Sequence, residues 1–142
     1  MIANISTGTL GFPRMGPKRE LKFALEKYWQ SPDLTKEAQL KELLHVARSI
    51  EESSWTTQRN AGINRITVGD FYLYDSVLQW TEMIGIIPTR FLNIPAGYPR
   101  MFAMARGVDD APALSTLAST DDYHHSVFES THLLFTISTL LF

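Results

Sequence analysis

Residues 10–29, LGFPRMGPKRELKFALEKYW, constrain this chain more than any other stretch. Their pattern predicts the end of a strand, a turn rich in Gly and Pro, and a helix over 17–30. Pro17 suits the first helical position, where its missing N–H leaves no hydrogen bond unmade. Apolar residues then recur at helical spacing and predict one stripe that faces a core, formed by Leu21, Ala24, Leu25, Tyr28 and Trp29.

A basic cluster occupies the turn and the first helical turn. It comprises Arg14, Lys18, Arg19 and Lys22, and only Glu20 has the opposite sign. A helix N-terminus already carries partial positive charge, so cations are unfavourable there. Free amide groups beside such a cluster suit an anion, and the i,i+3 and i,i+4 spacing allows the side chains to converge on one polyanionic ligand. The alternative is a solvated basic patch.

The remaining pattern predicts strands that alternate with helices, which is typical of an α/β fold with parallel strands. The expected elements are strands over 8–11 and 63–68, a long helix from an N-cap at Thr35 to a stop at Gly62, and a helix over 72–83 that ends at Gly85 and buries Val77, Leu78 and Met83. Charged residues on the long helix are expected to form a solvated face.

Asp70 and Asp75 follow the second expected strand. Functional residues of α/β proteins gather just past the carboxyl ends of strands, so both are candidates for ligand contact. For Asp70 the alternative is an N-cap role for the next helix. Met101 and Met104 lie three residues apart, and this spacing favours core packing.

Composition excludes several classes of protein. Thirteen Lys and Arg residues against fifteen Asp and Glu residues argue against a nucleic-acid or membrane-surface binder. No cysteine is present, so neither a disulfide nor a thiolate metal site is possible. The first residues lack a basic start followed by an apolar run, so no secretory signal is expected and the cytoplasm is the expected location. A length of 142 residues allows one domain or part of one.

Two features near the C-terminus need separate interpretation. Residues 121–125, DDYHH, contain four side chains that bind metals, but adjacent residues rarely point at one ion, so no metal site is expected. The apolar run over 133–142 is shorter than the roughly 20 residues that span a bilayer. We interpret residues 126–142 as foreign sequence at a premature end.

The chain resembles the start of the cobalamin-independent methionine synthase family. The resemblance is strong over residues 9–107 and weak over 120–125. It is carried by Leu-Gly-Phe-Pro-Arg at 10–14, Gly16, Arg-Glu-Leu-Lys at 19–22, Tyr-Trp at 28–29, the Gly-Asp-Phe-x-x-Tyr-Asp pattern at 69–75, and Phe-Ala-Met-Ala-Arg-Gly at 102–107. In the weak segment Tyr123 and His124 match, whereas Asp122 replaces an Asn.

The resemblance implies a fold, a function and a site. The fold is a partial (βα)8 TIM-like barrel with a helix-rich N-terminal portion, in which residues 1–125 form a folate-side fragment and 126–142 an unmatched apolar tail. The family transfers a methyl group from 5-methyltetrahydrofolate polyglutamate to homocysteine. The residues implied in folate binding are Arg19, Glu20, Leu21 and Lys22, with weaker roles for Arg14, Lys18 and Asp122.

The resemblance also implies limits. Zinc and homocysteine belong to a C-terminal barrel that is absent here, so this chain is expected to hold no catalytic residue and no cofactor of its own. It would contribute folate binding in methionine biosynthesis and be inactive alone. The alternative is a non-catalytic truncated remnant or interaction fragment that binds no ligand.

Overall fold

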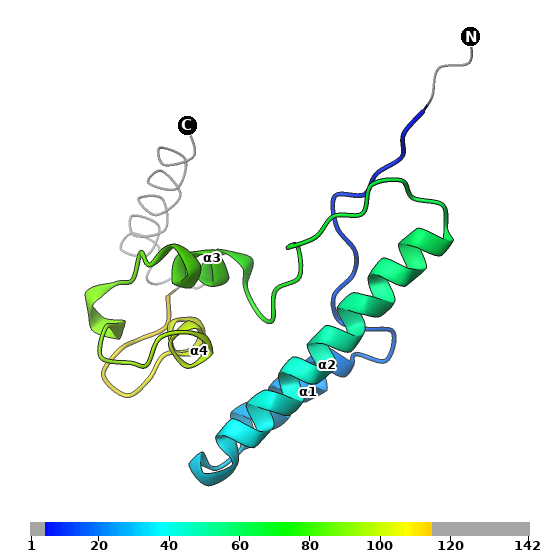
Figure 1. The fold of residues 1–142 in the computed structure, drawn as a ribbon. Coiled ribbons are helices and arrows are strands. Elements are labelled where there is room, and N and C mark those ends of the chain that lie inside the picture. Colours follow the sequence, from blue (N-terminus) through cyan, green and yellow to red (C-terminus); the bar gives the residue numbers. More distant parts are fainter. Residues whose placement is uncertain (1–4, 115–142) are drawn as a thin grey trace, which may run out of the picture. The chain divides into compact units, whose positions relative to one another are not determined.

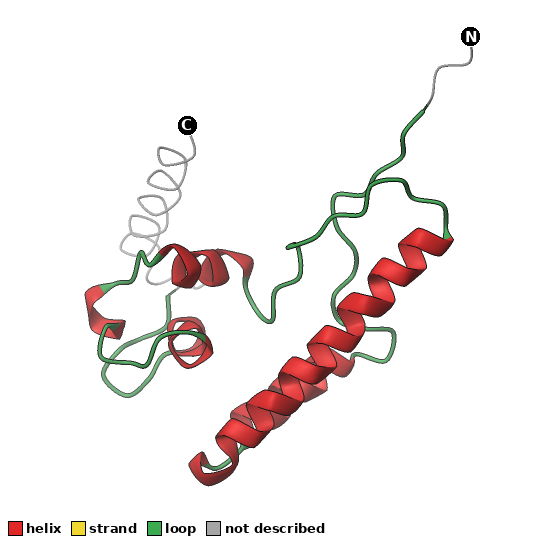
Figure 2. Cartoon of the chain, in the orientation of Figure 1, coloured by secondary structure: helices red, strands yellow, loops and turns green. Residues whose placement is uncertain are grey.

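A computed structural model describes residues 5–114, and helices dominate this part of the chain (Figures 1 and 2). The chain divides into two compact units, with the boundary between Leu73 and Tyr74. The first unit contains helix α1, Glu20–Gln30, and helix α2, Asp33–Asn60. The second contains helix α3, Ser76–Ile84, the 3₁₀ helix η1, Thr89–Phe91, and helix α4, Tyr98–Arg106.

Helices α1 and α2 pack against each other as a hairpin, with a short turn at Ser31 and Pro32 (Figure 1). The predicted stripe of α1 is confirmed at its centre, because Leu21, Leu25 and Tyr28 are buried. The α2 side chains of the core include Leu43 and Ala47. These apolar side chains hold the hairpin together, since burial of apolar surface is the main favourable contribution to such packing.

The helix starts differ from the prediction. Helix α1 begins at Glu20, three residues after Pro17, because Arg19 has a left-handed conformation (φ 62, ψ 32) that a helix cannot include. Helix α2 has Pro32 rather than Thr35 at its N-cap. The Thr35 hydroxyl instead donates a hydrogen bond to the Pro32 carbonyl at 3.1 Å.

The predicted stop of the long helix at Gly62 is confirmed. Gly62 has φ 80, a conformation that glycine adopts without steric cost. Its N–H donates to the Arg59 carbonyl at 3.0 Å, and the Ile63 N–H donates to the Gln58 carbonyl at 3.2 Å. These two bonds form a Schellman motif and satisfy carbonyl groups that the helix end leaves free.

The predicted strands over 8–11 and 63–68 are wrong as regular strands. Residues 5–114 contain none, and a single parallel bridge joins Gly8 to Arg65. An isolated pair of extended segments gains too little to form a stable ladder, so side chains supply much of the contact. The Asn64 side chain accepts from the Thr7 N–H at 3.0 Å, for example, and the Thr67 hydroxyl donates to the Thr9 carbonyl.

The second unit is built around α3 and α4. Helix α3 begins at Ser76 because Asp75 is its N-cap and accepts a hydrogen bond from the Leu78 N–H at 3.0 Å. The predicted end at Gly85 is confirmed. Leu78 is buried as expected, whereas Met83 is 65% exposed and Thr81 takes a core position. Met101 and Met104 are almost fully buried, which confirms their core-packing role.

A largely buried ion pair joins α3 to the start of α4. The two Arg100 nitrogens Nε and Nη2 each lie 2.8 Å from a Glu82 carboxylate oxygen, and the Gly97 N–H donates to the same carboxylate at 2.6 Å. Both side chains are about one-seventh exposed or less. The Arg100 hydrogen bonds hold the pKa of Glu82 below its ordinary value of 4.5.

Helix packing predicts a contrast between two leucines of α2. Leu43 is fully buried, and Leu34 is fully exposed. We expect Leu43→Ala to lower the free energy of unfolding by about 2–5 kcal/mol, because the change leaves a cavity in the core. Leu34→Ala serves as the matched control and should have almost no effect. Urea unfolding followed by far-UV circular dichroism measures both, and equal losses would contradict this packing.

The ion pair predicts a pH dependence. Because the folded-state pKa of Glu82 is depressed, its stabilising contribution is complete above the unfolded pKa of about 4.5. The contribution is lost as the pH falls through the folded-state pKa. We expect the difference in unfolding free energy between the natural chain and Glu82→Gln to shrink as the pH falls from 6 to about 3. A difference that stays constant over this range would show that the carboxylate is not ionised in the pair.

Candidate functional site

The segment before α1 lies along residues 58–73 and is held there by hydrogen bonds. The Thr9 N–H donates to the Arg65 carbonyl at 3.3 Å. The Thr9 hydroxyl lies 2.5 Å from Oε1 of Gln58, a buried residue near the end of α2. These bonds fix the path of the chain immediately before the predicted basic turn.

Two further contacts hold the turn itself. The Phe12 N–H donates to Oδ2 of Asp70 at 3.1 Å. Arg14 donates from Nη1 to the Leu73 carbonyl at 3.1 Å, and its guanidinium lies 4.2 Å from the centre of the Tyr72 ring. Asp70 therefore contacts the turn, and the N-cap alternative for it is wrong because Asp75 has that role.

Glu20 closes the start of α1. Its Oε2 accepts from the Lys18 N–H at 2.9 Å, and the Arg19 N–H donates to the Gly16 carbonyl at 3.1 Å. Gly16 has φ 78, a conformation that favours glycine, and a Cβ atom there would lie 2.2 Å from Glu20 Oε2, so the Glu20 side chain would have to move. The Glu20 carboxylate thus satisfies the Lys18 amide in the turn before α1 and offsets part of the local positive charge.

The structure places the predicted site residues in different environments. Lys18 and Arg19 are exposed at the start of α1. Lys22 is half-exposed and lies 3.5 Å from Glu26, one turn further along. Arg14 faces Tyr72, and Leu21 is fully buried, so the Leu21 side chain supports the hairpin instead of facing a ligand. Asp122 lies outside the described residues.

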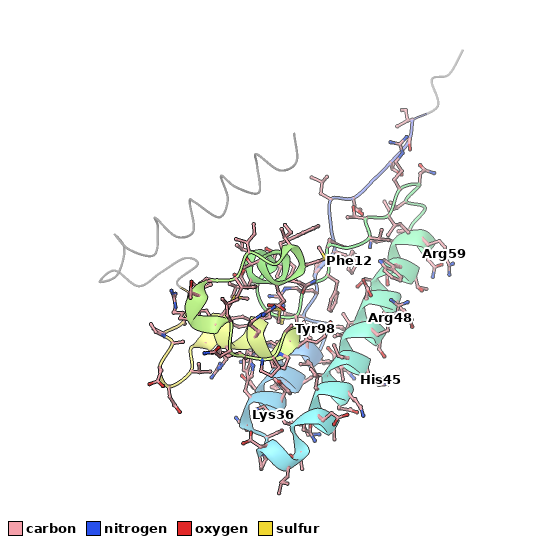
Figure 3. The ribbon with its side chains drawn as sticks, turned by 60° about the vertical axis from the view of Figure 1, so that its left-hand side comes forward. Phe12, Lys36, His45, Arg48, Arg59 and Tyr98 are labelled. Atoms are coloured by element: carbon pink, nitrogen blue, oxygen red, sulfur yellow. The ribbon has the colours of Figure 1, made fainter. Side chains whose placement is uncertain are left out.

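A groove of about 660 Å³ runs between the turn and α2. The turn contributes Phe12 and Met15, which are partly exposed, and Glu20 lines the same side. Figure 3 shows Phe12 on the turn segment and His45 on α2, and both line the groove. The α2 lining also includes the apolar residues Val46 and Ile50 and the hydroxyl residues Ser49, Ser53, Ser54 and Thr57.

This groove was not predicted from the sequence, which for the outer face of α2 indicates only that the charged residues are solvated. That assignment holds for Lys41, which pairs with Glu37 at 2.8 Å, and for Arg48, which pairs with Glu51 and Glu52. The groove forms on another face of the helix. The sequence does indicate that one face of α2 carries Val46, Ser49, Ile50 and Ser53, because they recur at helical spacing. It does not indicate that the turn covers this face, because the course of the turn depends on the distant residue Asp70.

Among residues 5–114, no three His, Asp or Glu side chains come close enough together to hold a metal ion. None of the described helices is long and apolar enough to cross a membrane. The DDYHH segment and the tail over 126–142 lie outside these residues.

Comparison with known proteins supplies the family. Residues 6–134 match the cobalamin-independent synthase N-terminal domain, a range that runs past the boundary expected at residue 125. A 5-methyltetrahydropteroyltriglutamate–homocysteine methyltransferase from Trichodesmium erythraeum is 47% identical over 129 residues, which cover 90% of this chain and 16% of the relative. The enzyme of the same name from Thermosynechococcus vestitus is 48% identical over 126 residues, and that from Catharanthus roseus is 40% identical over 123.

The chain therefore spans about one-sixth of the length of these relatives. The matched range includes the basic turn, the hairpin of α1 and α2, and the helices α3, η1 and α4 of the second unit. Because the match covers most of the chain, the protein belongs to the cobalamin-independent synthase family and corresponds to its N-terminal domain.

Proposed function

We propose that this chain supplies folate recognition to an enzyme that transfers a methyl group from 5-methyltetrahydropteroyltriglutamate to homocysteine. The names of the relatives support the reaction. One structural observation carries the assignment to residues 14–22: Lys18 and Arg19 are exposed together at the start of α1. A helix start with adjacent cations favours a multiply charged anion, and a triglutamate tail carries one carboxylate on each glutamate and a further one at its end.

Lys22 completes the proposed anion site. Its ammonium lies 3.5 Å from Glu26, and both side chains are about two-fifths exposed. Such a surface pair contributes little to stability, so a ligand carboxylate replaces Glu26 at low cost. Lys22 lies in the first turn of α1, and Lys18 and Arg19 directly precede that helix, so the three cations are grouped around its start.

The barrel expected from the family remains part of this proposal. The bridge between Gly8 and Arg65 is parallel, which is the pairing that a (βα)8 barrel uses. Zinc does not fit the described residues, since they bring no metal-ligating group of three together and the chain has no cysteine. We assign zinc and homocysteine to the remainder of the longer enzyme, and the residues of this chain bind and orient the folate only.

The function is tested by calorimetric titration of the chain with monoglutamyl and triglutamyl 5-methyltetrahydrofolate. We expect the triglutamate to bind more tightly, and Lys22→Ala to remove most of that difference because it deletes one cation of the site. Lys41→Ala is the matched control, since Lys41 also pairs with a glutamate four residues away on a helix. Heat from neither ligand would favour the interaction fragment without ligand binding.

The left-handed conformation of Arg19 predicts a trade-off between stability and binding. Glycine adopts φ 62 without the steric cost that a side chain brings. We expect Arg19→Gly to raise the free energy of unfolding by about 1 kcal/mol and to weaken triglutamate binding.

Arg19→Ala separates the two effects, because it removes the charge but keeps a Cβ atom in the strained conformation. It should weaken binding as much as Arg19→Gly without the gain in stability. Urea unfolding and calorimetry measure the two quantities. Unchanged binding in both variants would remove Arg19 from the site.

A further inference from the structure

We propose that Asp70 is a positioning residue that holds the basic turn in the orientation its anionic ligand requires, without touching the ligand. This inference rests on the proposed folate recognition and adds a residue to it. A carboxylate beside a site for a polyanion repels the ligand, so a direct binding role for Asp70 is unfavourable. A role through the backbone of the turn explains why a carboxylate lies there.

The contact between Asp70 and the turn is close and specific. Oδ2 of Asp70 accepts from the Phe12 N–H at 3.1 Å. A Cβ atom on Gly11 would lie 3.0 Å from the same oxygen, so the glycine allows the carboxylate to approach the backbone. The hydrogen bond joins residues 58 positions apart in the sequence. A charged acceptor makes it stronger than a bond between neutral groups.

A second contact on the same segment holds the other end of the turn. Arg14 donates to the Leu73 carbonyl at 3.1 Å and stacks over Tyr72. Residues 70–73 therefore hold the chain at Phe12 and at Arg14, and the proline between them fixes its own φ. The Leu21 N–H donates to the Met15 carbonyl at 3.2 Å, so the start of α1 follows directly from the held turn. Release of Asp70 would leave the cations on a loosely held loop.

The test compares two variants of the full chain in titrations with triglutamyl 5-methyltetrahydrofolate. We expect Asp70→Ala to weaken binding about tenfold, because the lost hydrogen bond releases the turn. Asp70→Asn keeps an oxygen acceptor and should bind within about twofold of the natural chain. The sign is diagnostic, since removal of a repulsive carboxylate alone would strengthen binding of an anion. Glu42→Ala, which removes an exposed carboxylate of α2, is the control.

Hydrogen exchange of the Phe12 amide, measured by NMR, supplies a readout that does not depend on the ligand. We expect protection to be lost in Asp70→Ala and kept in Asp70→Asn, while far-UV ellipticity shows that the helices persist. Unchanged or tighter binding by Asp70→Ala would overturn the positioning role and leave the proposed function intact.

Two further outcomes would overturn the positioning role of Asp70. Weak binding by Asp70→Asn with a protected Phe12 amide would show that Asp70 touches the ligand, which overturns the inference even if Asp70→Ala loses its helices. Absence of binding by the natural chain would overturn the proposed function, and the positioning role with it.

Discussion

The contacts of Asp70 with Phe12 and of Arg14 with Leu73 fix where the N-terminal segment lies, and the course of the basic turn depends on that placement. Each contact joins residues nearly sixty positions apart, which is costly for an open loop. The hairpin of α1 and α2 removes most of that cost, because it folds the intervening chain back on itself. Burial of Leu21, Leu25 and Leu43 therefore stabilises the polar contacts indirectly.

Helix lengths explain the course of the turn. At 1.5 Å per residue, the 28 residues of α2 extend roughly 42 Å, whereas the 11 residues of α1 extend roughly 17 Å. The chain before α1 must cover the difference in order to reach the end of α2, where Thr9 contacts Gln58. Residues 12–17 therefore lie beside α2 and make one wall of the groove. The groove thus results from unequal helix lengths in the hairpin.

Local signals in the sequence predict the features that depend on local chemistry. The stripe of α1, the stops at Gly62 and Gly85, and the burial of Met101 follow from spacing or from backbone freedom, and the structure confirms them. The start at Pro17 failed because a single residue, Arg19, has a left-handed conformation that no pattern reports. The contact of Asp70 with Phe12 was equally out of reach, since it requires the hairpin to have formed.

The extended segments show the same dependence on context. A parallel strand in an α/β protein is buried on both faces and paired on both edges. Here Ile5, Leu10 and Val68 are 71–100% exposed, and the bridge at Gly8 is isolated. An inner strand of a barrel requires apolar residues of this kind in an extended segment. The chain spans only about one-sixth of the length of its relatives. In the barrel proposed above, further strands would supply the pairing that turns these segments into a ladder.

The basic turn combines two unfavourable features that the fold does not need. Arg19 places a side chain in a left-handed conformation, at a cost of about 1–2 kcal/mol. Lys18, Arg19 and Lys22 add positive charge to a helix start that is already positive, and Glu20 offsets only part of it. Strain and unfavourable charge that coincide at one exposed place are characteristic of a functional site, where a ligand supplies the missing interaction. An anion bound at these residues would relieve the repulsion between the cations and would contact the Arg19 side chain that the left-handed backbone holds at the helix start.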